Sequence, residues 1–150
     1  MIPFYTKFPE LADTETRTIT TTNDPILPDA QYGFIESFCE KKNCDCRRVL
    51  ISVFSDKTKG KILATINYGW EDSEYYSDFI SIYNREDIKG PFLDPLNPQS
   101  EYSEYLLALF KQLLRDPEYV KRLETHYKLF KSTVTQKTSK RRKIKKKRRK

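Results

Sequence analysis

The chain has 150 residues, of which 37% are hydrophobic, and its formal net charge is +7. Ten of the basic side chains lie in residues 140–150, so the remaining 18 basic and 21 acidic side chains give the rest of the chain a net charge of about −3. This length suits one compact domain. No apolar run reaches the roughly 20 residues of a membrane-spanning helix, and residues 1–13 lack the features of a secretory signal.

The N-terminal part of the chain predicts little regular structure. Residues 1–30 contain Thr and Ile residues that favour extended backbone, but Pro25 and Pro28 interrupt any long element. We expect an irregular arm with a short strand near residues 17–22. Residues 32–39 alternate weakly and are rich in aromatics, so their period is compatible with a strand or with one or two helical turns.

The middle of the chain predicts antiparallel strands. Residues 47–55 are β-branched and apolar on both faces, which is typical of a central strand buried on both sides. The turn residues 56–60 separate them from a second strand at 61–70, which makes a hairpin. Residues 75–83 alternate and predict a third strand, and the three prolines of residues 89–99 indicate a connection.

Two helices are predicted after this connection. The first begins at Asn97-Pro98 or at Ser100, because both provide a good cap. Asp116-Pro117 ends it and caps the second. Apolar residues recur at helical spacing in both helices: Tyr102, Leu106, Leu109, Phe110 and Leu113 in the first, and Val120, Leu123, Tyr127, Phe130 and Val134 in the second.

These elements predict an α+β fold, in which a small antiparallel β-meander of three to four strands is covered by two C-terminal helices. The expected organisation is an irregular arm (residues 1–30), a single α+β domain (residues 31–135) and a disordered basic tail (residues 136–150). The tail "KRRKIKKKRRK" has one apolar residue and cannot contribute to a core.

All three cysteines of the chain, Cys39, Cys44 and Cys46, lie within eight residues. An odd number of crowded cysteines is a poor disulfide framework, so reduced thiols and a cytoplasmic location are expected. Zn²⁺ prefers four tetrahedral ligands from Cys and His, and a tight turn can bring three sulfurs together. The only histidine, His126, is therefore the expected fourth ligand, at the edge of the apolar stripe of the second helix.

Such a structural Zn²⁺ site would join the hairpin to the C-terminal helix and stabilise a small core. The alternative interpretations are three incidental cysteines with a histidine satisfied at a helix edge, or a reactive cysteine beside the histidine. The Cys-x4-Cys-x-Cys spacing is not the common Cys-x2-Cys pair, so the spacing alone does not decide among these.

Three segments resemble a group of mostly uncharacterised bacterial proteins related to the SEC-C-motif proteins. They are "ESFCEKKNCDCRRVLISV", "ATINYGWE" and "ETHYKLFK", within residues 30–131. The resemblance implies no catalytic activity, and it places Cys39, Cys44, Cys46 and His126 in matching segments. In that group a short cysteine-rich zinc motif often follows the helices. Here that motif is absent and the basic tail follows instead.

The basic tail predicts contact with nucleic acid, because neutralising phosphates releases counterions and gives salt-sensitive, sequence-independent binding. A solvated tail that aids solubility, a nuclear import signal and an anionic membrane surface are alternatives. The expected phosphate contacts are Lys140, Arg141, Arg142, Lys143, Lys145, Lys146, Lys147, Arg148, Arg149 and Lys150.

Signals for an enzyme are few. Asp29 with Glu40 and Lys42 matches a short nuclease pattern that arises often by chance, so no catalytic residue is assigned. The acidic residues of 70–78 lack the spacing of a calcium loop, and the aromatics among them favour core packing over a pocket. The sequence thus predicts a non-enzymatic zinc-stabilised domain with a nucleic-acid-binding tail. A metal-dependent hydrolase or nuclease and a protein-interaction adaptor without nucleic-acid binding are the alternatives.

Overall fold

The computed structural model describes residues 1–77 and 88–148, with the side chains of the C-terminal helix described as far as Val134. Six strands form one antiparallel sheet, in the order β1-β3-β4-β5-β6 with β2 also paired to β3. The strands are β1 (Ile2–Pro3), β2 (Arg17–Thr20), β3 (Gln31–Phe38), β4 (Arg48–Ser55), β5 (Ala64–Gly69) and β6 (Phe92–Leu93). The helices are η1 (Phe4–Thr6), α1 (Pro9–Glu15), α2 (Ser73–Tyr76), α3 (Ser103–Leu113) and α4 (Pro117–Arg148).

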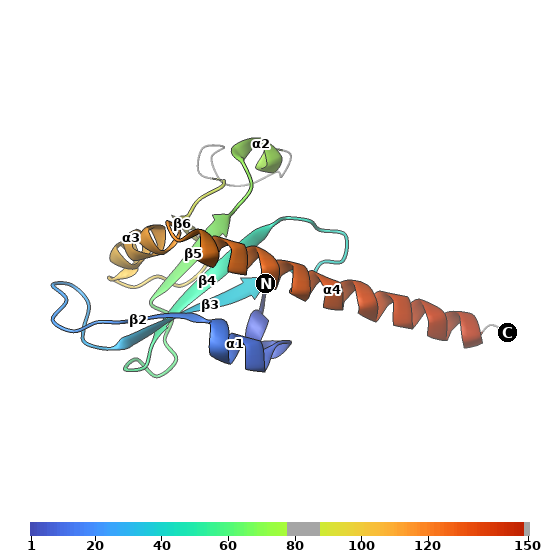
Figure 1. The fold of residues 1–150 in the computed structure, drawn as a ribbon, viewed down its shortest axis with the longest axis horizontal. Helices are drawn as coiled ribbons and strands as arrows, with labels where there is room; N and C mark the ends of the chain where they lie inside the picture. Colours follow the sequence, from blue (N-terminus) through green and yellow to red (C-terminus); the bar gives the residue numbers. More distant parts are fainter. Residues whose placement is uncertain (78–87, 149–150) are drawn as a thin grey trace.

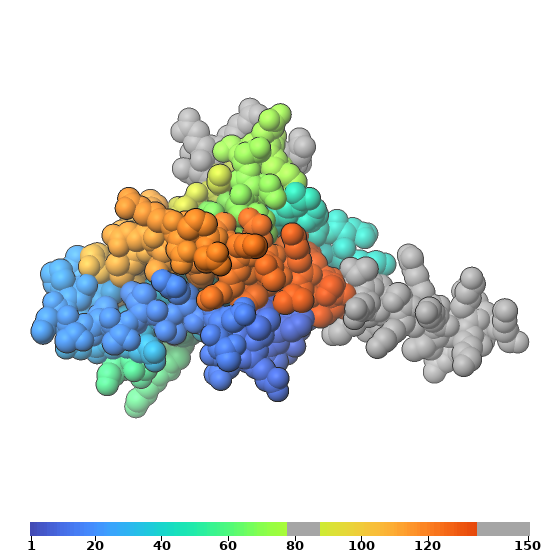
Figure 2. Space-filling model, viewed as in Figure 1, coloured from blue at the N-terminus to red at the C-terminus, as the bar shows by residue number. Residues whose placement is uncertain are grey.

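One face of the sheet carries the core. Alternate residues of β3 and β4 are buried, and their partners in β5 continue the same face. Helices α3 and α4 lie across this face, and α1 lies beside α4 (Figure 1). Figure 2 shows the same arrangement with side chains, with α4 running between the N-terminal segments and the β3–β4 connection. The predicted α+β fold with two helices over an antiparallel sheet is therefore confirmed.

Several local predictions needed correction. The predicted short strand near residues 17–22 is confirmed as β2, but the rest of the segment of residues 1–30, predicted as irregular, contains β1, η1 and α1. Both β1 and β2 pair with the edge of β3 that β4 leaves free. The strand β4 alternates between buried and half-buried residues, so it is not buried equally on both faces. The predicted strand at 75–83 is wrong at its start, where α2 forms, and its residues from 78 onward lie outside the described residues.

The strand buried on both faces is β5. On its second face the connection of residues 94–100 covers it: the Thr65 amide N–H and carbonyl are hydrogen bonded by Gln99 at 3.0 and 2.7 Å. Asn67 donates to Asp94 at 3.2 Å. Hydrogen bonds of Thr65 and Asn67 thus cover the second face of β5 in place of apolar packing. The hydrophobicity of the strand alone does not predict that this face is buried.

The C-terminal helix begins where the sequence predicts. Asp116 accepts a hydrogen bond from the Glu118 amide at 3.0 Å, as expected of a residue that caps a helix with Pro at its first position. The helix then continues to Arg148 and so includes most of the segment for which the sequence predicts no ordered element. Within the described ranges, no helix is both long enough and apolar enough to span a bilayer.

Candidate metal site and the adjoining polar network

The three cysteines come together at the connection between β3 and β4. Cys39 follows the last residue of β3, and Cys46 lies two residues before β4. Because the two strands pair antiparallel, their ends meet, and Cys44 is brought back by a turn in which its amide donates to the Lys41 carbonyl at 3.3 Å. The three Sγ atoms lie within 4.8 Å of one another. Sulfurs around a tetrahedral Zn²⁺ are about 3.8 Å apart, so this spacing fits a shared thiophilic metal ion.

The electrostatics of the three thiols are strongly coupled. Burial opposes ionisation of Cys39, but a hydrogen bond from the Lys41 backbone and the charge of Lys131 lower the pKa of its thiol. Burial and the negative charges of Cys44 and Cys39 raise the pKa of Cys46 to about 12. Three thiolates this close repel one another, and a bound divalent cation is the charge that would offset them. The donor set therefore fits a metal ion.

Helix α4 holds the cysteine turn from one side. Lys131 Nζ donates to the Lys41 carbonyl at 2.9 Å. The Tyr127 hydroxyl accepts from the Arg47 amide at 3.2 Å and donates to Asp45 at 3.0 Å. Arg47 has a φ of 46°, in the left-handed region that a non-glycine residue rarely adopts. The hydrogen bond to Tyr127 thus stabilises the left-handed backbone of Arg47, the residue that directly precedes β4.

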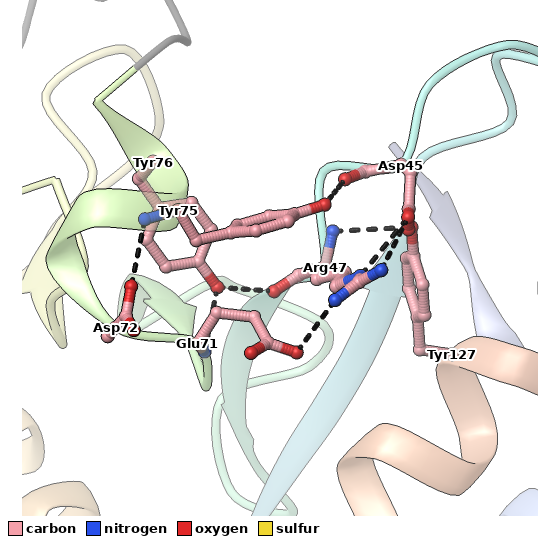
Figure 3. Close-up of polar contacts among 7 residues, drawn as sticks. All are labelled: Asp45, Arg47, Glu71, Asp72, Tyr75, Tyr76 and Tyr127. Atoms are coloured by element: carbon pink, nitrogen blue, oxygen red, sulfur yellow. Dashed lines mark hydrogen bonds and ion pairs between the residues drawn. The ribbon is translucent and has the colours of Figure 1, made fainter.

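A polar network holds the turn from the other side (Figure 3). The Arg47 guanidinium forms ion pairs with Asp45 at 3.0 Å and Glu71 at 3.2 Å, and the Arg47 carbonyl accepts from the Tyr76 hydroxyl at 2.8 Å. The Tyr75 hydroxyl donates to the Asp45 carbonyl. Glu71, Tyr75 and Tyr76, which lie in the segment that the sequence predicts to be an acidic loop with core aromatics, therefore brace the cysteine turn.

This bracing depends on the close approach of Tyr76 to the end of β5. A Cβ atom added to Gly69 would lie 2.3 Å from the Tyr76 hydroxyl oxygen. The Tyr76 ring is fully buried, and burial raises its pKa to about 12. Gly69 is thus the residue that leaves room for the ring, and it links the sheet to the network around Arg47.

The structure corrects the assignment of His126 as the fourth ligand. Its Nδ1 lies 2.7 Å from a Glu36 carboxylate oxygen and its Nε2 lies 2.5 Å from Glu15. The ring is 1% exposed and stacks on Phe4, with centroids 4.2 Å apart. Both nitrogens are thus used by carboxylates, and among the described residues no fourth His, Cys, Asp or Glu joins the three sulfurs.

The His126 contacts form a buried charged cluster that the sequence reasoning missed. Burial alone would lower the pKa of His126, but the hydrogen bonds and charges of Glu36 and Glu15 raise it. Burial raises the pKa of Glu36, and His126 opposes that change. Two signals were available: His126 lies three residues after Leu123 in the buried stripe of α4, and Glu36 alternates with Phe34 and Phe38 on the core face of β3.

Among the residues that the structure describes, the other carboxylates considered from the sequence do not join the group of three thiols. Asp29 accepts a hydrogen bond from the Asn23 amide at 2.9 Å, and Glu40 lies 4.0 Å from Lys7 with its side chain half-exposed. Within the described ranges these carboxylates belong to no set of residues close enough to share an ion. Of the ten basic tail residues, Lys140 to Arg148 continue α4, and their side chains lie outside the described part of the chain.

Comparisons with protein-family models, with curated proteins and with solved structures found no match to this chain.

Proposed function

We propose that this chain is a small metal-stabilised binding domain in which Cys39, Cys44 and Cys46 hold a thiophilic divalent ion, with Zn²⁺ as the first candidate. The observation that supports this most directly is the approach of three free thiols to within 4.8 Å of one another. Three soft sulfur ligands favour Zn²⁺ over Mg²⁺ or Ca²⁺, which prefer oxygen. The fourth ligand would be a water molecule or a group from a binding partner.

A bound ion would fix the β3–β4 connection against α4. The turn already contacts that helix through Tyr127 and Lys131. Binding energy for a structural ion is also folding energy, because the ligand geometry does not exist in the unfolded chain. Loss of the ion should therefore lower the melting temperature and loosen this connection first.

Elemental analysis of protein purified under reducing conditions tests the proposal. We expect about one metal ion per chain in the wild type and none in Cys44→Ser. Asn43→Ser is the matched control, because Asn43 is exposed in the same turn and has no thiol. Replacement by Co²⁺ should add thiolate-to-metal absorption bands. A wild-type chain that holds no metal and melts at the same temperature with and without chelator would overturn the proposal.

We also propose, from the sequence, that the basic tail binds nucleic acid through its phosphate groups. Residues 140–150 hold ten basic side chains and no acid, whereas the rest of the chain is net acidic. Binding should be independent of nucleic-acid sequence. The slope of log K against log salt should be negative and no steeper than about −9, the limit if ten phosphates are neutralised.

Deletion of residues 140–150 should abolish salt-dependent retention on duplex DNA or RNA, while Cys44→Ser should leave it unchanged. Unchanged retention after the deletion would show that the domain, and not the tail, binds the nucleic acid. The resemblance to SEC-C-related proteins stays a prediction from the sequence.

A further inference from the structure

A pocket of about 330 Å³ lies beside the cysteine turn, between the turn, the end of β5 and α4. Its aromatic walls are Trp70 and Tyr127, whose ring centroids are 5.2 Å apart with an angle of 69° between the planes. The two rings thus form a corner, and Trp70 is only half-buried. This volume is at the low end for ligand pockets, so it suits one long side chain rather than a nucleotide cofactor.

The charges around this corner are unevenly balanced. Three carboxylates (Asp45, Glu71 and Glu124) line the pocket with two cations (Arg47 and Lys128), which leaves one net negative charge. Arg47 is already held by Asp45 and Glu71. Glu124 is different, because among the described residues no Lys or Arg forms an ion pair with it.

Lys128 does not remove this imbalance. It lies one helical turn after Glu124 and is exposed, so any attraction between them is weak and is screened by salt. Glu124 is half-buried. Burial raises the pKa of Tyr68, and the negative charge of Glu124 raises it further. A carboxylate therefore stands at the rim of an aromatic corner without a firm cationic partner from the described chain.

We propose that this pocket binds the guanidinium of an arginine side chain presented by a basic peptide segment. The planar group would stack on the indole of Trp70, the aromatic ring that attracts cations most strongly, while Glu124 accepts its N–H donors. Arginine is favoured over lysine because its guanidinium combines stacking with a fork of donors. The protein already uses this contact nearby: the Arg47 and Arg48 guanidinium carbons lie 4.7 and 4.9 Å from the rings of Tyr75 and Tyr76.

Tryptophan fluorescence gives a direct test, since Trp70 is the only tryptophan of the chain. The probes are blocked pentapeptides, glycine except at the centre, where they carry arginine, lysine or citrulline. Citrulline has the shape of arginine without its charge. We expect a saturable change in emission with the arginine peptide, several-fold weaker binding with the lysine peptide, and no binding with the citrulline peptide. Blocked arginine amide, the free small cation, should bind as the peptide does if the side chain alone is recognised.

Glu124→Gln should weaken binding of the arginine peptide about tenfold, the loss expected for one charge-assisted hydrogen bond at a partly exposed site. Glu118→Gln is the control, because Glu118 is an exposed carboxylate on the same helix outside this pocket. Circular dichroism would confirm that both variants fold. Equal binding of the arginine and citrulline peptides, or full affinity in Glu124→Gln, would overturn the proposal.

The pocket needs no metal ion to bind arginine. The titration is therefore repeated on the full chain after chelation. Peptide binding that survives chelation would stand even if the metal assignment failed, and a metal site without peptide binding would refute only the pocket. Each titration is run at two protein concentrations, because arginines of the basic tail in a second copy would compete for the same pocket. A peptide affinity that weakens as the protein concentration rises would identify that competition.

Discussion

Removal of the His126 imidazole should strongly destabilise the fold. His126→Leu leaves the Glu36 carboxylate, only 3% exposed, without the nitrogen that lies 2.7 Å from it. Breaking a buried charged pair by removing one partner costs about 3–5 kcal/mol. For a chain of this length that free energy corresponds to a fall in melting temperature of roughly 6–20 °C.

Glu36→Leu should cost less, about 1–3 kcal/mol, because it leaves a single ring N–H without its acceptor. Glu36 pairs with Ile51 on the core face of the sheet, so a leucine at this position would have apolar neighbours. The double variant His126→Leu/Glu36→Leu removes both polar groups from the core. We therefore expect it to be more stable than His126→Leu alone, with a coupling free energy of at least about 2 kcal/mol.

Urea denaturation of the wild type, the two single variants and the double variant would measure this coupling. Glu15→Gln is a useful control, since the Glu15 side chain is 37% exposed and water can replace its contact with His126. Additive losses in the two single variants would show that the pair is not a coupled charged cluster. That result would also remove the reason given above for the raised pKa of His126.

Three other predictions follow from the described contacts. The pKa of His126 is raised on folding, so its stabilising effect is complete below its ordinary pKa of about 6.5 and is lost as the pH rises through the folded value. The free energy of unfolding should therefore fall as the pH rises above about 6.5 in the wild type and change less in His126→Leu, whereas an equal slope in both would contradict this. Gly69→Ala should destabilise the fold by about 1–3 kcal/mol, because the added Cβ would lie 2.3 Å from the Tyr76 hydroxyl oxygen. Gly33→Ala is the control and should have little effect in thermal melts, because the atom nearest its added Cβ is 3.7 Å away. Tyr127→Phe should lower the free energy of unfolding by about 0.5–1.5 kcal/mol, because the variant lacks the hydroxyl contacts with Arg47 and Asp45. It should also weaken metal retention in the elemental assay. Unchanged retention would show that the hydroxyl does not support the turn.

The sequence predicted the elements whose stability comes from local pattern. The apolar run from Arg48 to Ser55 forms β4, and the cap at Asp116 begins α4 as expected. The three thiols also meet, because a hairpin brings its two ends together regardless of the rest of the fold. These features depend on neighbouring residues, which a single sequence displays directly.

Features that depend on distant pairing were not predictable in the same way. The role of His126 is set by Glu36 and Glu15, which are 90 and 111 positions away in the chain. A histidine in a buried stripe is compatible with a metal ligand or a charged cluster, and only the position of the partners distinguishes them. The strand β1 was missed for the same reason, since it has only two residues and exists because β3 offers a free edge.

His126 and Tyr127 are consecutive residues of α4, yet they contact two separate groups of residues: His126 contacts Glu36 and Glu15, and Tyr127 contacts the cysteine turn at Asp45 and Arg47. Successive side chains of a helix point about 100° apart, so the two contacts together fix the rotation of α4 about its own axis. Sliding the helix by one position would separate both residues from their partners at once. The cysteine turn and the carboxylates of α1 and β3 are thus set in a common register by one pair of adjacent side chains.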